Sequence, residues 1–303
     1  MENFIYSMII AATPLLLAAI GELVAERSGV LNLGVEGMML MGAVVAFAVA
    51  NSTGSTPLAI LAGAGAGAGM ALIFSVIALS LLANQAATGL ALTIFGIGAS
   101  GLIGQSFVGI ALEPLAKLSI PFLTESTAVG RILLGHDPMV YMALALAAGV
   151  AWFLYNTRGG LALRAVGDNH DSGHALGYNV IAIRYMATLF GGACAGLGGA
   201  YLSLAYTPMW AENMTAGRGW IALALVVFAT WRPLRLVAGA YLFAAVTQLQ
   251  FYGQDWGLPI ASQFLAMAPY VATILALVII SRDVNLTKAN APACIGKPFR
   301  AER

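Results

Sequence analysis

The sequence predicts an all-α polytopic membrane protein with about nine transmembrane spans. Of its 303 residues, 60% are hydrophobic and only 9% are charged, and the mean hydropathy is +0.87. A soluble domain carries about 25% charged residues, so this chain has too little charge to cover a water-exposed surface. Apolar runs recur along the whole sequence, and many approach the roughly 20 residues that cross a bilayer as a helix. Helices are expected because a membrane-embedded backbone must satisfy its own hydrogen bonds.

The apolar runs place the spans in a single transmembrane domain over residues 1–282, with a tail of little expected order over 283–303. The second and seventh spans are short, which predicts broken or partly re-entrant elements. If the boundaries of these spans are shifted, the predicted number of spans ranges from eight to ten. The expected spans lie near 5–24, 36–50, 58–82, 87–105, 138–155, 185–205, 217–231, 236–252 and 263–281.

The distribution of Lys and Arg predicts the orientation in the membrane. If the loop 156–184 is cytoplasmic, eleven Lys and Arg residues fall on that side, and only Lys117, Arg131 and Arg218 fall outside. Positive residues are enriched in cytoplasmic loops, so we expect the N-terminus outside and the C-terminus in the cytoplasm. The longest outside loop, 106–137, is expected to hold short interfacial helices.

A weak internal symmetry links two parts of the chain. The span 5–24 leads into ERSGVLNLGVEGMMLMGAVVAF, and the span 185–205 is followed by AENMTAGRGWIALALVVF. In each, a full-length helix leads through a polar connection containing glycine into an apolar helix. With nine spans the two units enter from opposite sides, which predicts the inverted repeats of many transporters. Coincidental similarity between apolar segments is the alternative.

The connection ERSGVLNLGVEGMM predicts part of a transport pathway through Asn32 and Glu36. Ionisable residues inside a membrane are costly and are functional candidates for that reason. Glu36 lies near a helix start, where the helix dipole favours a carboxylate. Three roles stay open for it: capping and pairing at a helix break, direct substrate contact, and a proton relay.

The fourth span, TGLALTIFGIGASGLIGQ, adds Thr93, Phe95 and Ser100 to the predicted pathway. Its glycines predict a bent helix that lines a cavity, because glycine tolerates close backbone approach. Phe95 is the aromatic residue best placed to stack on a planar ligand, and the alternative is a phenylalanine that faces lipid or the core.

Two further patterns concern packing and nucleotide binding. GAGAGAG at 63–69 is a small-residue face for close helix packing, not a phosphate loop, since it lies inside a span and no lysine follows it. No G-x-x-x-x-G-K-[ST] motif occurs in the sequence, so we expect ATP to be bound by another chain. We expect no cofactor on this chain.

The polar stretch RAVGDNHDSGHALGYNV, residues 164–180, interrupts the apolar runs. His170 and His174 have the i, i+4 spacing of zinc ligands, but only two aspartates accompany them, and no nucleophile does. We interpret both histidines as neutral and solvent-exposed, and expect no metal or catalytic site. A short amphipathic helix is expected instead, capped by Asp168 or Asn169 and ended by Gly177, which docks on a partner.

Several separated blocks resemble one family. ERSGVLNLGVEGMMLMGA, TRGGLALRAVGDNHDSGHALGYNV, AGLGGAYLSL, GRGWIALALVVFATWRPL and a last span ending in IISR occur in this order. They resemble the permease family of ABC importers that includes branched-chain amino acid and simple sugar permeases. The resemblance is strongest to the nucleoside-type permeases that work with basic-membrane-protein-like lipoprotein receptors.

The resemblance implies a non-enzymatic permease subunit in the bacterial cytoplasmic (inner) membrane. Its coupling helix would dock on a cytoplasmic ABC ATPase that carries ATP and Mg²⁺. A second permease subunit of different sequence, an external substrate-binding protein or lipoprotein, and membrane lipid are the other implied partners, and no nucleic acid is implied. The ATPase-coupling residues are Arg164, Gly167, Asp168, Asn169, Ser172, Leu176 and Gly177.

The expected cargo is a nucleoside, with purine nucleosides favoured. Simple sugars, riboflavin and branched-chain amino acids are alternatives within the same machine, and an ion-coupled secondary transporter is the rival of a different class. The sequence departs from the family pattern at HDSGH, where Pro- and Ala-rich residues are more usual. The histidine pair is therefore expected to be specific to its own ATPase partner.

Overall fold

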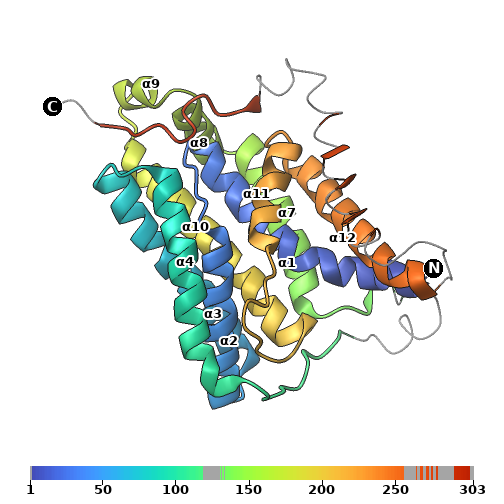
Figure 1. Cartoon of the computed structure of the whole chain (residues 1–303). Helices are drawn as coiled ribbons and strands as arrows, with labels where there is room; N and C mark the ends of the chain where they lie inside the picture. Colours follow the sequence, from blue (N-terminus) through green and yellow to red (C-terminus); the bar gives the residue numbers. More distant parts are fainter. Residues whose placement is uncertain are drawn as a thin grey trace.

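The computed structural model describes residues 2–118, 130, 132, 134–255, scattered positions between 264 and 278, and 290–300. Its described residues are helical, apart from connections and two isolated β-bridges. The long helices are α1 (Glu2–Arg27), α2 (Val35–Thr53), α3 (Thr56–Ser75), α4 (Gln85–Gly104), α7 (Pro138–Asn156), α10 (Val180–Tyr201) and α12 (Pro233–Asp255) (Figure 1). The short elements are η1 (Val76–Ser80), η2 (Gln105–Phe107), α8 (Arg158–Asp168), α9 (His170–Ala175), η3 (Leu202–Tyr206) and α11 (Arg218–Phe228).

Seven described helices are long and apolar enough to cross a membrane, and α11 is a shorter apolar helix. They correspond to the first eight predicted spans, so the predicted fold class is confirmed. α11 is short, as expected. The expectation of a short second span is wrong: α2 continues through the polar residues 51–53 and ends only at Gly54, which has a φ of 65°. The predicted span 263–281 lies mostly outside the described residues, as does most of the central part of the loop 106–137.

Helix starts follow local sequence rules. In five helices a side-chain oxygen just before the first turn accepts a hydrogen bond from a backbone N–H of that turn. Such caps satisfy donors that have no partner within the helix. The capping residues are Asn84 for α4, Asp137 for α7, Thr157 for α8, Asn169 for α9 and Asn179 for α10.

The core forms where α1, α2 and α3 pack around α10. Glycines of α10 let the other backbones approach closely. A Cβ on Gly199 would overlap the carbonyl oxygen of Met39 on α2, and one on Gly198 would lie 2.7 Å from the carbonyl oxygen of Pro14 on α1. This is the packing expected of small residues in a membrane, where close van der Waals contact replaces the hydrophobic drive between helices.

The GAGAGAG run of α3 has two distinct faces. Gly63 and Gly67 meet α10, and a Cβ on Gly63 would lie 2.9 Å from the Cβ of Ala200. Gly65 and Gly69 have nothing within 4 Å of their Cβ positions. The predicted packing role is confirmed for every second glycine of the run.

The two connections noted in the sequence both lead into helices. Residues 28–34, called here the α1–α2 break, join α1 to α2, and residues 207–217 join η3 to α11. The two helices start close together, and Figure 1 shows α2 running from there toward one end of the molecule and α11 toward the other. The repeated layout of long helix, polar connection and second helix is therefore present, with the second helices opposed.

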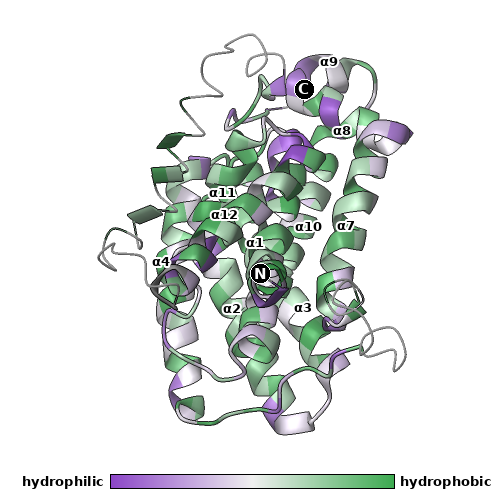
Figure 2. Cartoon of the chain, turned by 90° about the vertical axis from the view of Figure 1, so that its right-hand side faces the viewer, coloured by the Kyte–Doolittle hydropathy of each residue, from purple (hydrophilic) through white to green (hydrophobic). Residues whose placement is uncertain are grey.

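The C-terminal tail differs from its expectation. Residues 290–300 lie against α8 and α9, with hydrogen bonds from Cys294 N to the Gly167 carbonyl (2.9 Å) and from Gly296 N to the Gly29 carbonyl (3.1 Å). Phe299 is buried against Val166 and Val180. The expectation of little order is wrong for these residues, because apolar side chains and backbone hydrogen bonds fix them. Figure 2 shows hydrophilic residues gathered at the end of the molecule that carries α8 and α9.

Candidate functional site

Buried side chains hold the α1–α2 break. The backbone N–H of Leu31 donates to Gln85 Oε1 at 2.9 Å, and that of Asn32 donates to Glu22 Oε1 at 3.4 Å. The Asn32 side chain accepts from Gly34 N at 2.9 Å. Backbone groups that leave a helix inside a membrane need such partners, since lipid offers none. Oε2 of Glu22 and Nε2 of Gln85 are buried with no hydrogen-bond partner in the part of the chain that the structure describes.

One face of α4 packs on this break. Thr93 Oγ1 donates to the Leu33 carbonyl at 3.0 Å. A Cβ on Gly89 would lie 2.6 Å from Leu33 N, and one on Gly96 would lie 2.5 Å from Gly37 Cα. The glycines of α4 therefore allow close approach to the break and to α2.

Glu36 joins the starts of α2 and α11. Its Oε1 accepts from Thr215 Oγ1 at 2.5 Å and from Gly217 N at 2.8 Å, and its Oε2 accepts from Gly219 N at 2.6 Å. The carboxylate is buried and lies in the first turn of α2 and at the first turn of α11. Two helix N-termini favour its negative charge. This geometry supports the capping and pairing role among the three roles left open for Glu36.

The structure distributes the predicted pathway residues over two environments. Asn32, Glu36 and Thr93 are buried around the break, and Ser100 is buried further along α4, where its hydroxyl donates to the Ile97 carbonyl at 3.1 Å. Phe95 lies on the opposite face of α4 and is 56% exposed. Their contact with substrate stays a prediction.

The polar stretch between α7 and α10 forms two helices, α8 and α9. Asn169 caps α9, its Oδ1 accepting from Ser172 N at 2.9 Å, and Gly177 ends the segment with a φ of 87°. The predicted short helix is confirmed, with Asn169 as the cap. Asp168, Asn169, Ser172 and Gly177 are exposed, and Leu176 is 76% exposed.

Two other predicted coupling residues face inward. A Cβ on Gly167 would overlap the carbonyl oxygen of Arg27, so glycine is needed where α8 crosses the end of α1. The guanidinium of Arg164 lies 5.1 Å from the ring centroid of Tyr155 on α7. These two residues position α8, while the other predicted coupling residues, around α9, are exposed; their contact with an ATPase stays a prediction.

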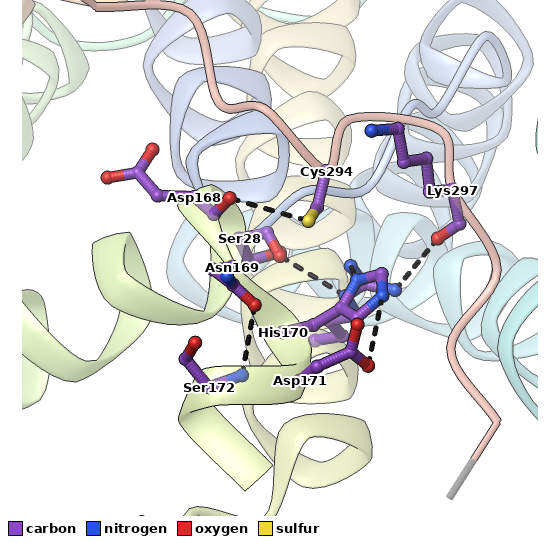
Figure 3. A network of polar contacts seen from close by, with 9 residues as sticks. Ser28, Asp168, Asn169, His170, Asp171, Ser172, Cys294 and Lys297 are labelled. Atoms are coloured by element: carbon purple, nitrogen blue, oxygen red, sulfur yellow. Dashed lines mark hydrogen bonds and ion pairs between the residues drawn. The ribbon is translucent and has the colours of Figure 1, made fainter. Parts of the chain in front are cut away.

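Arg184 of α10 connects three segments at this end of the molecule. Figure 3 shows the three residues that it contacts, Ser28, His170 and Lys297, close together. Its Nε donates to the Ser28 carbonyl in the α1–α2 break at 3.2 Å. Its Nη1 donates to the Lys297 carbonyl in the tail at 3.0 Å, and its Nη2 to His170 Nδ1 in α9 at 3.0 Å. The side chain is 1% exposed. A single buried cation thus links the predicted coupling helix, the break and the tail.

The expectation that both histidines are exposed is wrong for His170, which is 8% exposed. Its Nδ1 accepts from Arg184, so the ring is neutral. Burial lowers the pKa of His170, and the charges of Arg184 and Lys297 lower it further, against an opposing effect of Asp171. The ring also contacts Phe299, at 5.2 Å between centroids. His174 is exposed, as expected.

Sequence reasoning did not identify Arg184, Glu22, Gln85 or Thr215 as members of these networks. Arg184 carried one signal, because it directly precedes the predicted apolar span 185–205, and an arginine at such a place needs acceptors if it is buried. The partners of Arg184 are 14, 113 and 156 residues away in the chain, so its role depends on tertiary structure.

Comparison with known proteins identifies the family. The family model described as branched-chain amino acid transport system / permease component matches residues 4–281. The chain belongs to this permease family. No solved structure matches the permease.

Three curated relatives match the permease over more than 90% of its length. It is 39% identical to the putative glucose ABC transporter permease protein TsgC13 of Haloferax volcanii, over 93% of both chains. It is 33% identical to the guanosine ABC transporter permease protein NupQ of Bacillus subtilis, over 96% of this chain and 94% of the relative. It is also 33% identical to the nucleoside ABC transporter permease protein NupC of Lactococcus lactis subsp. cremoris, over 98% and 96% of the two chains.

The permease is therefore a multi-pass transport component of an ABC transporter and not an enzyme. Such a component implies ATPase and substrate-binding components on other chains. Family membership also sets aside the ion-coupled secondary transporter as the rival reading.

Proposed function

We propose that this permease forms the translocation pathway of an ATP-driven importer for nucleosides, with purine nucleosides favoured. Two relatives named for guanosine or nucleoside transport match it over more than 90% of its length. The exposed ring of Phe95 on α4 gives a planar surface on which a nucleobase can stack. Both observations support a nucleoside as cargo.

The Arg184 network carries the proposed coupling mechanism. The ATPase docks on the exposed residues around α9, including Ser172 and Leu176. When ATP binding moves that surface, His170 moves with it, and Arg184 transmits the displacement to Ser28 in the break. α4 packs on the same break through Thr93, so the displacement reaches the helix that carries Phe95.

The remaining parts of the machine are supplied by other chains. ATP and Mg²⁺ are bound by the ATPase, and this chain is expected to bind no cofactor. A second permease of different sequence completes the pathway, and an external binding protein delivers substrate. The N-terminus lies outside and α8, α9 and the tail lie in the cytoplasm, as the eleven-to-three distribution of Lys and Arg favours.

A sugar is the second candidate cargo, favoured by the 39% identity to a putative glucose permease. A nucleoside also contains a sugar, so a pathway for either must accept a ring bearing several hydroxyls. The planar base separates the two cargoes: a nucleoside needs a stacking surface, and glucose does not. Substitution of Phe95→Ala should therefore weaken nucleoside transport more than glucose transport.

Uptake in reconstituted vesicles tests the proposal. The permease is assembled with its ATPase, second permease and receptor, and uptake of labelled guanosine, adenosine and glucose is measured with ATP and with a non-hydrolysable analogue. We expect uptake of both nucleosides that requires ATP hydrolysis. Uptake of glucose alone would reject the nucleoside cargo, and uptake without hydrolysis would reject the ATP-driven mechanism. Vesicles without receptor serve as the control.

A further inference from the structure

α11 is held at both ends by residues that flank the α1–α2 break. At its start, the Glu36 carboxylate of α2 accepts two backbone N–H groups, at 2.8 Å and 2.6 Å. At its end, Glu26 and Arg27 of α1 bind Trp231. The break lies between these two attachments in the chain. A movement of the end of α1 relative to the start of α2 therefore acts on both ends of α11.

The attachment at the end of α11 consists of three hydrogen bonds. Trp231 Nε1 donates to Glu26 Oε2 at 2.5 Å, and the Trp231 carbonyl accepts from Arg27 Nε at 3.0 Å and from Arg27 Nη2 at 2.8 Å. All three residues are buried. Hydrogen bonds to charged groups are shorter and stronger than neutral ones. The end of α11 is therefore expected to follow the end of α1.

The turn after α11 is left-handed at two adjacent residues that carry side chains. Thr230 has a φ of 49° and Trp231 a φ of 51°. A left-handed residue commonly ends a helix, but it is usually glycine, because a Cβ lies too close to the following carbonyl oxygen. Among the described residues, Thr230 is the one β-branched residue with a positive φ, and the cost is greatest for such a side chain. The turn is therefore strained.

Contacts from three helices hold this turn in its costly conformation. Besides the bonds from α1, Arg235 Nη1 of α12 donates to Thr230 Oγ1 at 2.8 Å. The backbone N–H groups of Thr230 and Trp231 donate to the carbonyls of Val227 and Val226, at 2.9 Å and 3.1 Å. Strain that is kept in place by its surroundings is characteristic of switch regions. A helix stop without a moving role would be served by glycine.

We propose that Thr230 and Trp231 form a hinge at which α11 moves when the α1–α2 break moves. The inference rests on the proposed function, because ATP binding supplies the movement of the break. When the end of α1 shifts, the bonds of Glu26 and Arg27 to Trp231 shift with it and the left-handed turn relaxes. α11 stays tied to Glu36 at its start, so its direction changes relative to α1. The strain favours this movement, and the buried contacts favour the return.

Thr230→Asn tests the strain. Asparagine adopts the left-handed conformation more readily than threonine, and its amide oxygen can accept from Arg235. We expect the thermal midpoint of the purified complex to rise by about 2–4 °C. ATP-driven uptake in vesicles should fall at least threefold, because a relaxed turn favours the described conformation over the others in the cycle. Leu82→Asn, at a φ of 57° in the turn before α4, is the matched control: it should raise the midpoint and leave uptake unchanged.

Two results with Thr230→Asn would overturn the proposal. An unchanged or lower midpoint would show that the turn is not strained. A higher midpoint with unchanged uptake would show that the turn is a static helix stop.

A second measurement uses the unmodified complex, so it does not depend on the folding of a variant. Hydrogen exchange of the backbone N–H groups of residues 230–232 is compared between the nucleotide-free complex and the complex trapped with ATP and vanadate. These groups donate to carbonyls of residues 226–229, so movement at the hinge should lower their protection at least tenfold. ATP-driven uptake together with equal protection in both states would reject the hinge alone. Absence of ATP-driven uptake of any cargo would reject the proposed function, and the hinge with it.

Discussion

Nη2 of Arg184 donates to Nδ1 of His170 at 3.0 Å, and this contact ties α10 to the short helix α9. The same guanidinium reaches the carbonyls of Ser28 and Lys297. An arginine has five N–H donors in a fixed planar arrangement, which allows it to satisfy acceptors in three segments at once. The position of α9 therefore depends on both the break and the tail.

Replacing Arg184 with lysine should uncouple substrate transport from the ATPase. Lysine keeps the charge, but its compact ammonium group cannot reach three separated acceptors in the same geometry. We expect ATP-dependent uptake in vesicles to fall at least tenfold while the isolated ATPase keeps its activity. Arg232→Lys, at an exposed arginine whose Nε makes one long contact of 3.4 Å with Asn290, should lower uptake far less. Equal uptake by the two variants would show that the network does not transmit the movement.

Acidification should loosen α9 from the tail. The pKa of His170 is lower in the folded chain than its ordinary value of 6.5, so the unfolded chain binds more protons between the two values. The contribution of His170 to stability is therefore present above about pH 6.5 and is lost as the pH falls through the folded pKa. The protection of residues 290–300 against hydrogen exchange, measured relative to an unstructured peptide at the same pH, should fall as the pH is lowered.

His170→Gln is the matched variant for this prediction, because a glutamine oxygen can accept from Arg184 at every pH. It should flatten the pH dependence, whereas His174→Gln, at an exposed histidine, should leave it intact. If the pH dependence persists in the His170→Gln variant, another titratable group causes it.

Neutralising Glu36 should destabilise the permease. In Glu36→Gln one oxygen becomes an amide nitrogen, which cannot accept from Gly219 N or Gly217 N. Hydrogen bonds to charged groups are each worth about 1.5–3 kcal/mol. We expect a loss of about that size in the free energy of unfolding, measured as a lower thermal midpoint in detergent. Glu212→Gln, at an exposed carboxylate, should leave the midpoint unchanged.

Cysteines at Ser172 and Leu176 should crosslink to the ATPase, since both side chains are exposed around α9. A cysteine at Asn169 is a weaker probe, because removing this cap costs about 1 kcal/mol of helix stability. Both native cysteines are buried and can stay. A cysteine at the exposed residue Leu61 of α3 is the negative control. Absence of any crosslink from Ser172 and Leu176 would count against docking at α9.

Replacing Gly65 and Gly67 of α3 with alanine should have different effects on the stability of the permease. Gly67→Ala on α3 would overlap the carbonyl of Gly192, and overpacking typically costs about 1–3 kcal/mol. Gly65→Ala meets open space and should be neutral or stabilising, because alanine favours a helix over glycine. Thermal unfolding of the two variants measures the difference. Equal midpoints would contradict the assignment of the two faces.

Patterns local in the sequence predicted much of this fold. Composition predicted the helices, the small residues of α3 predicted its packing face, and Asn169 and Gly177 predicted the bounds of α9. The Arg184 network and the docking of the tail were not predictable, because each joins residues that are distant in the chain. The burial of His170 followed from that docking. Glu36 was found as a candidate from its charge, but its partners at α11 depend on how the two helix starts meet.

The contact between Cys294 and the end of α8 has a consequence for biosynthesis. Cys294 N binds the Gly167 carbonyl and its Sγ lies 3.5 Å from the Asp168 carbonyl, 126 residues away in the chain. A ribosome adds about 5–20 residues per second, so these residues emerge roughly 6–25 s after Asp168. During that interval α9 lacks the support of Phe299 and of the Lys297 carbonyl. The surface around α9 is thus finished only after translation has passed residues 290–300. If the ATPase docks there, as proposed, its recruitment waits until the described transmembrane helices have been made.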